Sequence, residues 1–236
     1  MKIYIGFDPR ETAAFAVARQ SVKRWGLRQW PVYGLVLDEM KQRGLYLRPT
    51  TKKVTSDGHT VLWDMISEAA MSTEHANARF LVPHLAGTGW ALFMDGDMMI
   101  RRNMTEIKLE SRYAVYCVKH NHVPHNTQKM DGQTQAAYAR KNWSSFMIFN
   151  CDHPSNKHLT VEMVNSRPGR DLHRFFWLDD DEIGELPVDW NWLVGHSDPS
   201  VDPANVHFTD GVPDMAGYEN VPYADEWRER LLEWAR

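Results

Sequence analysis

The sequence contains few cysteines and no long hydrophobic run. Cysteine occurs twice in 236 residues, at Cys117 and Cys151. This low number excludes a disulfide-rich scaffold and a cysteine-based zinc site. No apolar segment reaches the roughly 18 residues that a membrane-spanning helix needs, so we expect no transmembrane segment. Residues 1–11 become polar too early for a signal peptide, and we therefore expect a cytoplasmic protein.

The sequence also lacks an excess of either charge. The formal net charge is −4, the isoelectric point is about 6.3, and 25% of the residues are charged. Nucleic-acid-binding proteins usually carry a basic patch or a strongly basic composition, so no nucleic-acid partner is expected. Hydrophobic residues make up 43% of the chain, which is typical of a globular protein, and no repeat or linker divides it. We therefore expect a single domain comprising residues 1–236.

The N-terminal segment has the pattern of a strand, a helix and a second strand. Residues 2–7 and 32–37 are short, apolar and rich in strand-forming side chains. Between them, apolar residues recur at helical spacing, at Phe15, Ala18, Val22 and Trp25. This order predicts an α/β fold with parallel strands. Such folds bind ligands at the carboxyl ends of their strands, which points to residues 7–10.

The expected start of this helix contains the residues of a capping box. Asp8 is suited to the N-cap and Pro9 to the first helical position. Glu11 follows three residues after Asp8, as a capping box requires.

Similar patterns predict the remaining elements. We expect further strands at 90–94, 112–118 and 146–149, and helices at 72–81 (ended near Pro83), 155–165 (capped by Ser155) and 224–235. Residues 38–60 are polar and are expected to form a loop or an excursion from the domain, and residues 120–132 are expected to be a loop. In the last helix, Trp227, Leu231 and Trp234 are expected on one buried face.

Two carboxylates, Asp95 and Asp97, directly follow the apolar segment 90–94, with only Gly96 between them. In an extended chain, residues two apart point to the same face, with Cα atoms roughly 7 Å apart. Two carboxylates cannot be buried together unless a divalent cation or an arginine offsets their charge. The alternative is a solvated turn at the end of a strand, where Asp-Gly is common.

Residues 72–100 resemble the donor-site region of glycogenin-like retaining glycosyltransferases, which have a GT-A fold. In that family a helix with an Arg-apolar-Pro run precedes an apolar strand and an Asp-x-Asp motif, and Arg79 and Pro83 stand at the matching positions. The resemblance implies a Rossmann-like α/β fold with a mixed central sheet and helices on both faces. It further implies a nucleotide-binding half at about 1–118 and an acceptor half at about 119–236.

The resemblance also implies roles for the acids and their neighbours. Asp95 and Asp97 would bind Mn²⁺, or Mg²⁺, on the diphosphate of a nucleotide sugar, with a UDP-sugar as the expected donor. Asp97 would thereby take part in catalysis, and Arg79 would contact the donor. Asp8 would accept a hydrogen bond from the nucleobase, a role that is compatible with helix capping.

Residues 207–215 resemble a second motif of the family, His-x-x-Gly-x-x-Lys. His207 would be the third metal ligand, and Gly211 would lie beside the donor. A carboxylate and imidazole donor set favours Mn²⁺ over Mg²⁺. The family's phosphate-binding lysine is missing, because Asp214 and Met215 stand near its place.

Two further segments resemble the family's sugar-binding regions. Ser144 and Ser145 would contact the donor sugar, although they are also suited to capping a strand. Residues 178–193 resemble a late acidic segment in which one acid faces the sugar. Asp179, Asp180 and Asp181 are the alternatives, and we take Asp180 as the catalytic candidate; a solvated acidic loop is the other reading. Trp190 and Asn191 would contact the acceptor, whereas core packing is the usual fate of such a tryptophan.

These observations predict a metal-dependent glycosyltransferase that transfers a sugar to an acceptor hydroxyl, on a carbohydrate or another molecule, with retention of configuration. Two alternatives stay open. A haloacid-dehalogenase-like phosphatase also has an Asp-x-Asp motif after an apolar strand, although Met99 and the late position of the motif do not match it. A nucleotide-sugar-binding module without catalysis would agree with the missing lysine.

Overall fold

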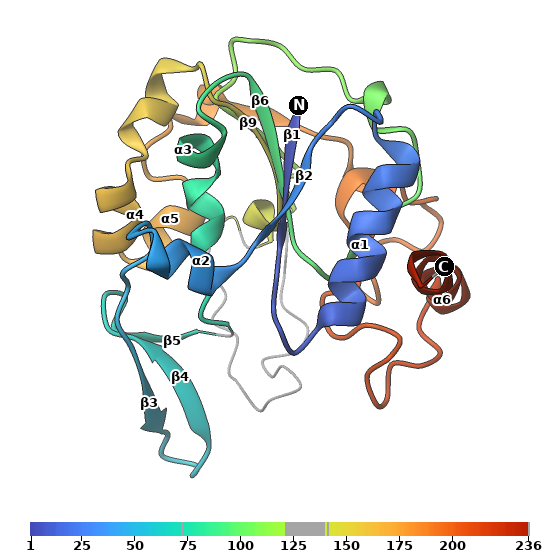
Figure 1. The fold of residues 1–236 in the computed structure, drawn as a ribbon, viewed down its shortest axis with the longest axis horizontal. Helices are drawn as coiled ribbons and strands as arrows, with labels where there is room; N and C mark the ends of the chain where they lie inside the picture. Colours follow the sequence, from blue (N-terminus) through green and yellow to red (C-terminus); the bar gives the residue numbers. More distant parts are fainter. Residues whose placement is uncertain (72, 121–139, 141, 236) are drawn as a thin grey trace.

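A mixed β-sheet with helices on both faces forms the centre of the protein (Figure 1). The computed structural model describes residues 1–71, 73–120, 140 and 142–235. Within these residues the central sheet has six strands, in the order β10-β8-β9-β6-β1-β2. Their bounds are β1 (Lys2–Gly6), β2 (Val32–Leu35), β6 (Trp90–Met94), β8 (Val115–Cys117), β9 (Phe146–Asn150) and β10 (Ile183–Glu185).

The strand directions make this sheet mixed. β1 pairs in parallel with β2 and with β6, whereas β9 runs antiparallel to both of its neighbours, β6 and β8. The carboxyl ends of β1 and β6 and the amino end of β9 therefore lie at the same edge of the sheet. The predicted mixed sheet is confirmed, and the strands expected at 2–7, 32–37, 90–94, 112–118 and 146–149 are all present, some of them shorter than expected.

Alternation of side chains along the strands divides the core into two layers. In β1, Ile3 and Ile5 pack against α1 (Thr12–Trp25), whereas Tyr4 faces the opposite layer. β6 alternates in the same way, because Leu92 lies on the α1 side and Phe93 on the other. Both faces of the sheet are therefore buried, as expected for a sheet covered by helices on two sides.

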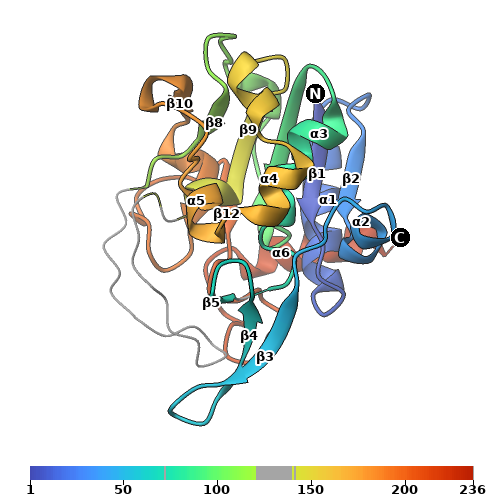
Figure 2. The same ribbon diagram turned by 90° about the vertical axis from the view of Figure 1, so that its left-hand side faces the viewer.

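The helices follow this division, as Figures 1 and 2 show. α1 and α6 (Ala224–Trp234) lie on one side of the sheet, and short helices cover the other. These are α2 (Leu37–Gln42), α3 (Val82–Ala86), α4 (Val161–Ser166) and α5 (Gly169–His173). Among the described residues, no helix is long and apolar enough to cross a membrane.

Two smaller sheets complete the described structure. One contains β11 (Trp192–Leu193), β12 (Asn205–His207) and β7 (Met98–Ile100), and β12 runs antiparallel to β7. The other is an antiparallel arm of β3 (Thr50–Val54), β4 (Thr60–Asp64) and β5 (Ala69–Met71), which projects from the body of the protein (Figure 2). Short 3-10 helices connect the larger elements: η1 (Ala78–Leu81), η2 (Met104–Glu106), η3 (Trp143–Ser145), η4 (Pro154–His158), η5 (Asp180–Glu182) and η6 (Val188–Asn191).

The predicted start of α1 is wrong. The helix begins at Thr12, and neither Asp8 nor Glu11 makes a side-chain cap. The Asp8 carboxylate instead accepts the backbone N–H of Arg10 at 2.9 Å, and the backbone N–H of Glu11 donates to the carbonyl of Asp8 at 3.0 Å. A turn at residues 8–11 thus precedes the helix and leaves the Glu11 side chain available to the site described below.

Residues 38–60 form an excursion with regular structure rather than a loop, because they contain α2, β3 and the start of β4. β3 is exposed along most of its length, so it lacks the apolar alternation by which strands are recognised. A buried ion pair joins Arg48, which precedes β3, to Asp64 at the end of β4, and Arg48 also donates to the carbonyls of Val164 and Arg167. The predicted loop at 120–132 lies outside the described residues, apart from His120.

Three predicted helices differ in their details. Residues 74–77 are turns and residue 72 is not described, so the helix expected at 72–81 is replaced by η1 and then α3, with Pro83 in the first turn of α3. A proline fits there because the first-turn N–H groups have no partner within a helix. Residues 155–165 contain the end of η4 and most of α4, which is capped by Thr160 rather than Ser155. In α6, Trp227 is buried, but Trp234 is exposed.

Gly96 lies against the carboxyl end of β1. A Cβ atom at residue 96 would lie 2.6 Å from the carbonyl oxygen of Gly6, which is too close for any side chain. A Cβ at residue 6 would make only ordinary contacts of 3.7 Å or more. The backbone at the end of β1 and the backbone after β6 therefore approach each other so closely that residue 96 must be a glycine.

We expect Gly96→Ala to lower the free energy of unfolding by about 1–3 kcal/mol, because the backbone must move to admit the methyl group. Gly6→Ala is the matched control on the other side of the same contact, and its effect should stay within about 1 kcal/mol. Urea denaturation of both variants measures the difference. Equal stability of the two variants would contradict the close approach.

Candidate metal and donor site

Asp95 and Asp97 lie at the carboxyl edge of the central sheet, which is the edge where the parallel strands β1 and β6 have their carboxyl ends. β6 ends at Met94, so Asp95 is the first residue beyond it, and Asp97 directly precedes β7. The antiparallel strand β9 brings η3 to the same edge, where the backbone N–H of Asp95 donates to the carbonyl of Ser145 at 2.9 Å. The turn between β6 and β7 is thus held by its neighbours in the fold.

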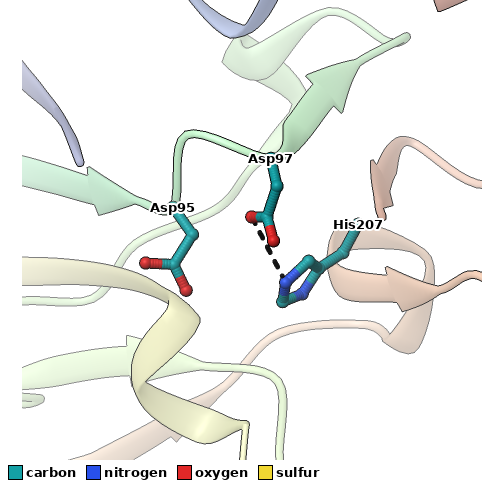
Figure 3. Close-up of side chains that lie close together, drawn as sticks. All are labelled: Asp95, Asp97 and His207. Atoms are coloured by element: carbon teal, nitrogen blue, oxygen red, sulfur yellow. Dashed lines mark ion pairs between the residues drawn. The ribbon is translucent and has the colours of Figure 1, made fainter. Parts of the chain in front are cut away.

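His207 reaches the acids through strand pairing. β12 runs antiparallel to β7 with His207 opposite Met98, and the N–H of Phe208 donates to the carbonyl of Asp97 at 3.0 Å. The Nε2 atom of His207 lies 3.4 Å from Oδ1 of Asp97. One ligand atom from each of Asp95, Asp97 and His207 can be chosen so that all three lie within 4.8 Å of one another. Figure 3 shows the three side chains converging from two segments that are far apart in the sequence.

These residues line a cavity of about 500 Å³. The cavity opens at the edge of the sheet and is large enough for a small organic ligand. The fold brings together eight residues that the sequence predicted for the site: Asp8, Arg79, Asp95, Asp97, Ser144, Ser145, Gly211 and His207.

Arg79 is almost fully buried and binds Asp95 with two nitrogens. Its Nη2 lies 2.8 Å from Oδ1 of Asp95 and its Nη1 lies 3.2 Å from Oδ2. Nη1 also donates to the carbonyl of Ser144 at 2.8 Å, and Nε donates to the carbonyl of Ala76 at 2.7 Å. The arginine therefore holds the Asp95 carboxylate in place and offsets its charge. The predicted contact of Arg79 with the donor stays a prediction.

The carboxylates of the site are short of positive charge. Burial raises the pKa of Asp95, the Arg79 guanidinium opposes this shift, and the charge of Asp97 adds to it. Each Asp95 oxygen retains a lone pair beyond its bond to Arg79, since a carboxylate has about four acceptor positions. Two carboxylates and one imidazole are donors that Mn²⁺ accepts, so the residues present fit a divalent cation.

Three predicted site residues do not line this cavity. Asp180 is exposed in η5 and forms an ion pair with Arg140. Trp190 is buried and stacks on Phe146, with ring centroids 6.4 Å apart. Asn191 is completely buried and bonds to His207. The structure therefore offers no support for the predicted roles of Asp180, Trp190 and Asn191 at the sugar or the acceptor.

Other residues line the cavity that the sequence did not identify as functional. The Nδ1 atom of His173 lies 2.6 Å from Oγ of Ser144. Burial, followed by the charges of Arg79 and Arg48, lowers the pKa of His173 to about 3. His75 also lines the cavity, and burial lowers its pKa to about 4, assisted by Arg79. Both imidazoles are therefore neutral at pH 7. No local pattern distinguishes either histidine from an ordinary helix or turn residue.

Glu11 is a third residue that lines the cavity and that the sequence did not identify as functional. Burial, followed by the charges of Asp97 and Asp8, raises its pKa to about 7. Its position a few residues after the first strand could have indicated a residue of the ligand site, but the capping-box pattern explained the side chain as a helix cap. Because Glu11 does not cap the helix, its carboxyl group faces the other acids of the cavity.

Several solved structures share this fold. The galactosyltransferase LgtC, solved with donor and acceptor sugar analogues, matches 99% of this chain and 96% of its own chain with a TM-score of 0.57 and 14% identity. The glycosyltransferase GlyE of Streptococcus pneumoniae matches with a TM-score of 0.59 and 13% identity over 99% of this chain and 61% of its own. The bifunctional glycosyltransferase WbbM matches with a TM-score of 0.59 and 14% identity over the whole chain, which spans about half (51%) of WbbM. The chain thus has the GT-A fold of these glycosyltransferases.

Sequence comparison identifies the family. No protein-family model matches the chain. Protein CDI of Arabidopsis thaliana is 36% identical over 241 residues, which cover 99% of this chain and 86% of CDI. The chain belongs to the family of protein CDI.

Glu11 makes stability depend on pH. A carboxyl group with a pKa of about 7 in the folded state, above its ordinary value of 4.5, binds more protons in the folded state than in the unfolded state between these two pH values. Its favourable contribution is therefore present below about pH 4.5 and is lost as the pH rises through 7. We expect the free energy of unfolding of the metal-free protein to fall more steeply between pH 5 and 8 than that of Glu11→Gln.

Urea denaturation at the two pH values measures this difference. Glu229→Gln removes an exposed carboxyl group in α6 and is the control, which should follow the wild type. If Glu11→Gln also followed the wild type, the shifted pKa would be wrong.

Proposed function

We propose that this protein is a metal-dependent glycosyltransferase that moves a sugar from a nucleoside-diphosphate sugar to an acceptor hydroxyl. The observation that carries the proposal is the convergence of Asp95, Asp97 and His207 in the lining of one cavity, at the carboxyl edge of the sheet. Ligands of open α/β folds bind at this edge. The GT-A fold supports the same conclusion.

Asp95, Asp97 and His207 would hold Mn²⁺ or Mg²⁺. When bound, the cation offsets the negative charge that builds on the departing diphosphate. Arg79 keeps the Asp95 carboxylate oriented toward the cation through its two-nitrogen contact. The backbone hydrogen bond from Phe208 to Asp97 keeps the turn that carries the two acids at a constant distance from β12, which carries His207.

The donor is proposed to be a UDP-sugar that occupies the cavity. Asp8 and Arg10 both line it, and Nη2 of Arg10 lies 2.7 Å from Oδ2 of Asp8. The nucleobase would lie beside Asp8. Arg10 is a basic residue of the cavity lining and compensates for the lysine that is missing near Asp214. Ser144, Ser145 and Gly211 would lie along the sugar and diphosphate.

The finer features rest on the resemblance to glycogenin-like enzymes. Retention of configuration, the UDP donor and membership of that subfamily are parts of the proposal. The acceptor is proposed to be a hydroxyl group, on a carbohydrate or another molecule. LgtC, whose structure contains donor and acceptor sugar analogues, supports a nucleotide-sugar donor and a carbohydrate acceptor. The cytoplasmic location expected from the sequence stays a prediction.

The structure favours this proposal over a phosphatase. In the phosphatases considered above, the acid pair lies near the N-terminus, whereas here it follows β6 and is completed by a histidine from β12. The matching structures are glycosyltransferases. A binding module without catalysis remains the second candidate, since the departure at Asp214 and Met215 removes a phosphate contact of the family.

The central experiment is a thermal-shift titration with UDP, with and without Mn²⁺, followed by assays of UDP-sugar hydrolysis and transfer. At a ligand concentration of 100 Kd, binding stabilises the native state by about 2.7 kcal/mol. For a chain of this size, that corresponds to an increase in Tm of roughly 5–10 °C. We expect Asp97→Asn to lose the Mn²⁺-dependent part of the shift and to lower turnover at least about 100-fold.

Asp57→Asn is the matched control, because Asp57 is an exposed carboxylate at the tip of the arm. It should retain both the shift and the turnover. Full activity of Asp97→Asn with Mn²⁺ present would rule out the metal role. A Mn²⁺-dependent shift without turnover of any UDP-sugar would favour the binding module.

A second pair of variants compares the catalytic residue predicted from the sequence with a residue that the structure places in the cavity. Asp180 lies outside the cavity and His173 lines it. We expect Asp180→Asn to retain turnover within about twofold, whereas His173→Asn should lower it about tenfold or more because it disturbs Ser144. Steady-state kinetics with the UDP-sugar that proves active in the transfer assay measure the turnover of both variants. A large loss for Asp180→Asn alone would restore the role that the sequence predicted for Asp180.

A further inference from the structure

Asn191 occupies a buried position beside the metal-binding residues without lining the cavity. It ends η6, and its exposed fraction is 0%. Its side-chain amide lies between three partners, which belong to β12 and to the segment that leads into β9. These partners are Nδ1 of His207 at 2.9 Å, Oγ of Ser145 at 2.9 Å and the backbone carbonyl of Asn142 at 3.2 Å.

The partners determine which way the amide points. A backbone carbonyl only accepts hydrogen bonds, so the atom of Asn191 that faces Asn142 is the amino nitrogen, Nδ2. The same nitrogen also donates to Ser145. The oxygen Oδ1 is then the atom that faces His207, and Oδ1 can only accept. The proton of this contact must therefore be carried by Nδ1 of His207.

This assignment determines what the other side of the imidazole presents. A neutral imidazole with its proton on Nδ1 has a lone pair on Nε2. Nε2 is the nitrogen that faces Asp97, at 3.4 Å from Oδ1. In metal sites, a partner of the second ring nitrogen commonly sets the tautomer and the ring orientation of the ligating histidine.

We propose that Asn191 is a positioning residue that keeps His207 in the Nδ1–H tautomer, with Nε2 directed at the cation site. This inference rests on the proposed metal-dependent function. It replaces the acceptor contact that the sequence predicted for Asn191. Ser145 accepts from Asn191 through its side chain and from the Asp95 N–H through its carbonyl, so one buried network orients both the histidine and the acid turn.

The test compares Asn191→Leu, which has a similar volume and no acceptor, with Asn191→Asp, which keeps an acceptor for Nδ1. Asn205→Leu is the matched control. Asn205 is equally buried and lies in β12 two residues before His207, but its Nδ2 donates to the carbonyl of Trp190 at 2.9 Å. Circular dichroism and urea denaturation establish that each variant is folded.

The first measurement is ¹⁵N NMR of the imidazole nitrogens in the full-length, metal-free protein at pH 8.5. We expect the Nδ1–H tautomer of His207 in the wild type, in Asn191→Asp and in Asn205→Leu, and a loss of this preference in Asn191→Leu. An Nε2–H tautomer or an imidazolium in the wild type would overturn the inference, whatever the variants do.

The second measurement is Mn²⁺ affinity in the presence of UDP, from the electron paramagnetic resonance signal of free Mn²⁺. Asn191→Leu should bind Mn²⁺ about 10–100-fold more weakly, whereas Asn191→Asp and Asn205→Leu should remain within about threefold of the wild type. Equal affinity of folded Asn191→Leu and the wild type would refute the positioning role and leave the proposed function intact. Absence of Mn²⁺ binding by the wild type would refute the metal-dependent function, and the role of Asn191 in metal binding with it.

Discussion

The antiparallel pairing of β7 with β12 is the interaction on which the site depends. It places His207 opposite Met98, the residue that follows Asp97. The backbone N–H of Phe208 also donates a hydrogen bond to the carbonyl of Asp97, which extends the contact to the acid itself. A slip of one residue would turn His207 to the opposite face of its strand, because side chains alternate along a strand. The distance between imidazole and carboxylate is therefore a consequence of backbone register, and any cation bound there uses a geometry that already exists.

The electrostatics of the cavity follow from this crowding of acids. Asp95, Asp97, Asp8 and Glu11 line one cavity, and burial, followed by the charges of neighbouring acids, raises the pKa values of Asp95 and Glu11. The Arg79 guanidinium offsets the charge of Asp95 and the Arg10 guanidinium that of Asp8, whereas the partly buried imidazoles of His75 and His173 are neutral. A divalent cation would relieve the remaining repulsion. The surplus of negative charge in the cavity would thus favour a cation and, through it, the phosphate groups of a nucleotide.

The parts of the fold that were predicted correctly are those with a strong local pattern. The strands at 90–94 and 146–149 are apolar, and the helix after the first strand has a clear buried stripe. In the arm, β3 and β5 were missed because these strands are largely exposed and therefore carry no apolar alternation. Asp180 was chosen from an acidic run, but that run lies on the surface, and His173 lines the cavity instead.

The sequence by itself determined that two carboxylates follow a buried strand, because apolar periodicity and the strand-ending Asp-Gly-Asp are local properties of the chain. It also supplied a late histidine by resemblance. Only the tertiary structure decided that His207 meets those acids, that Arg79 binds Asp95, and that Asn191 lies against the histidine. These contacts join residues 16 to 110 positions apart. They depend on how strands pair and cross, and no short stretch of sequence contains that information.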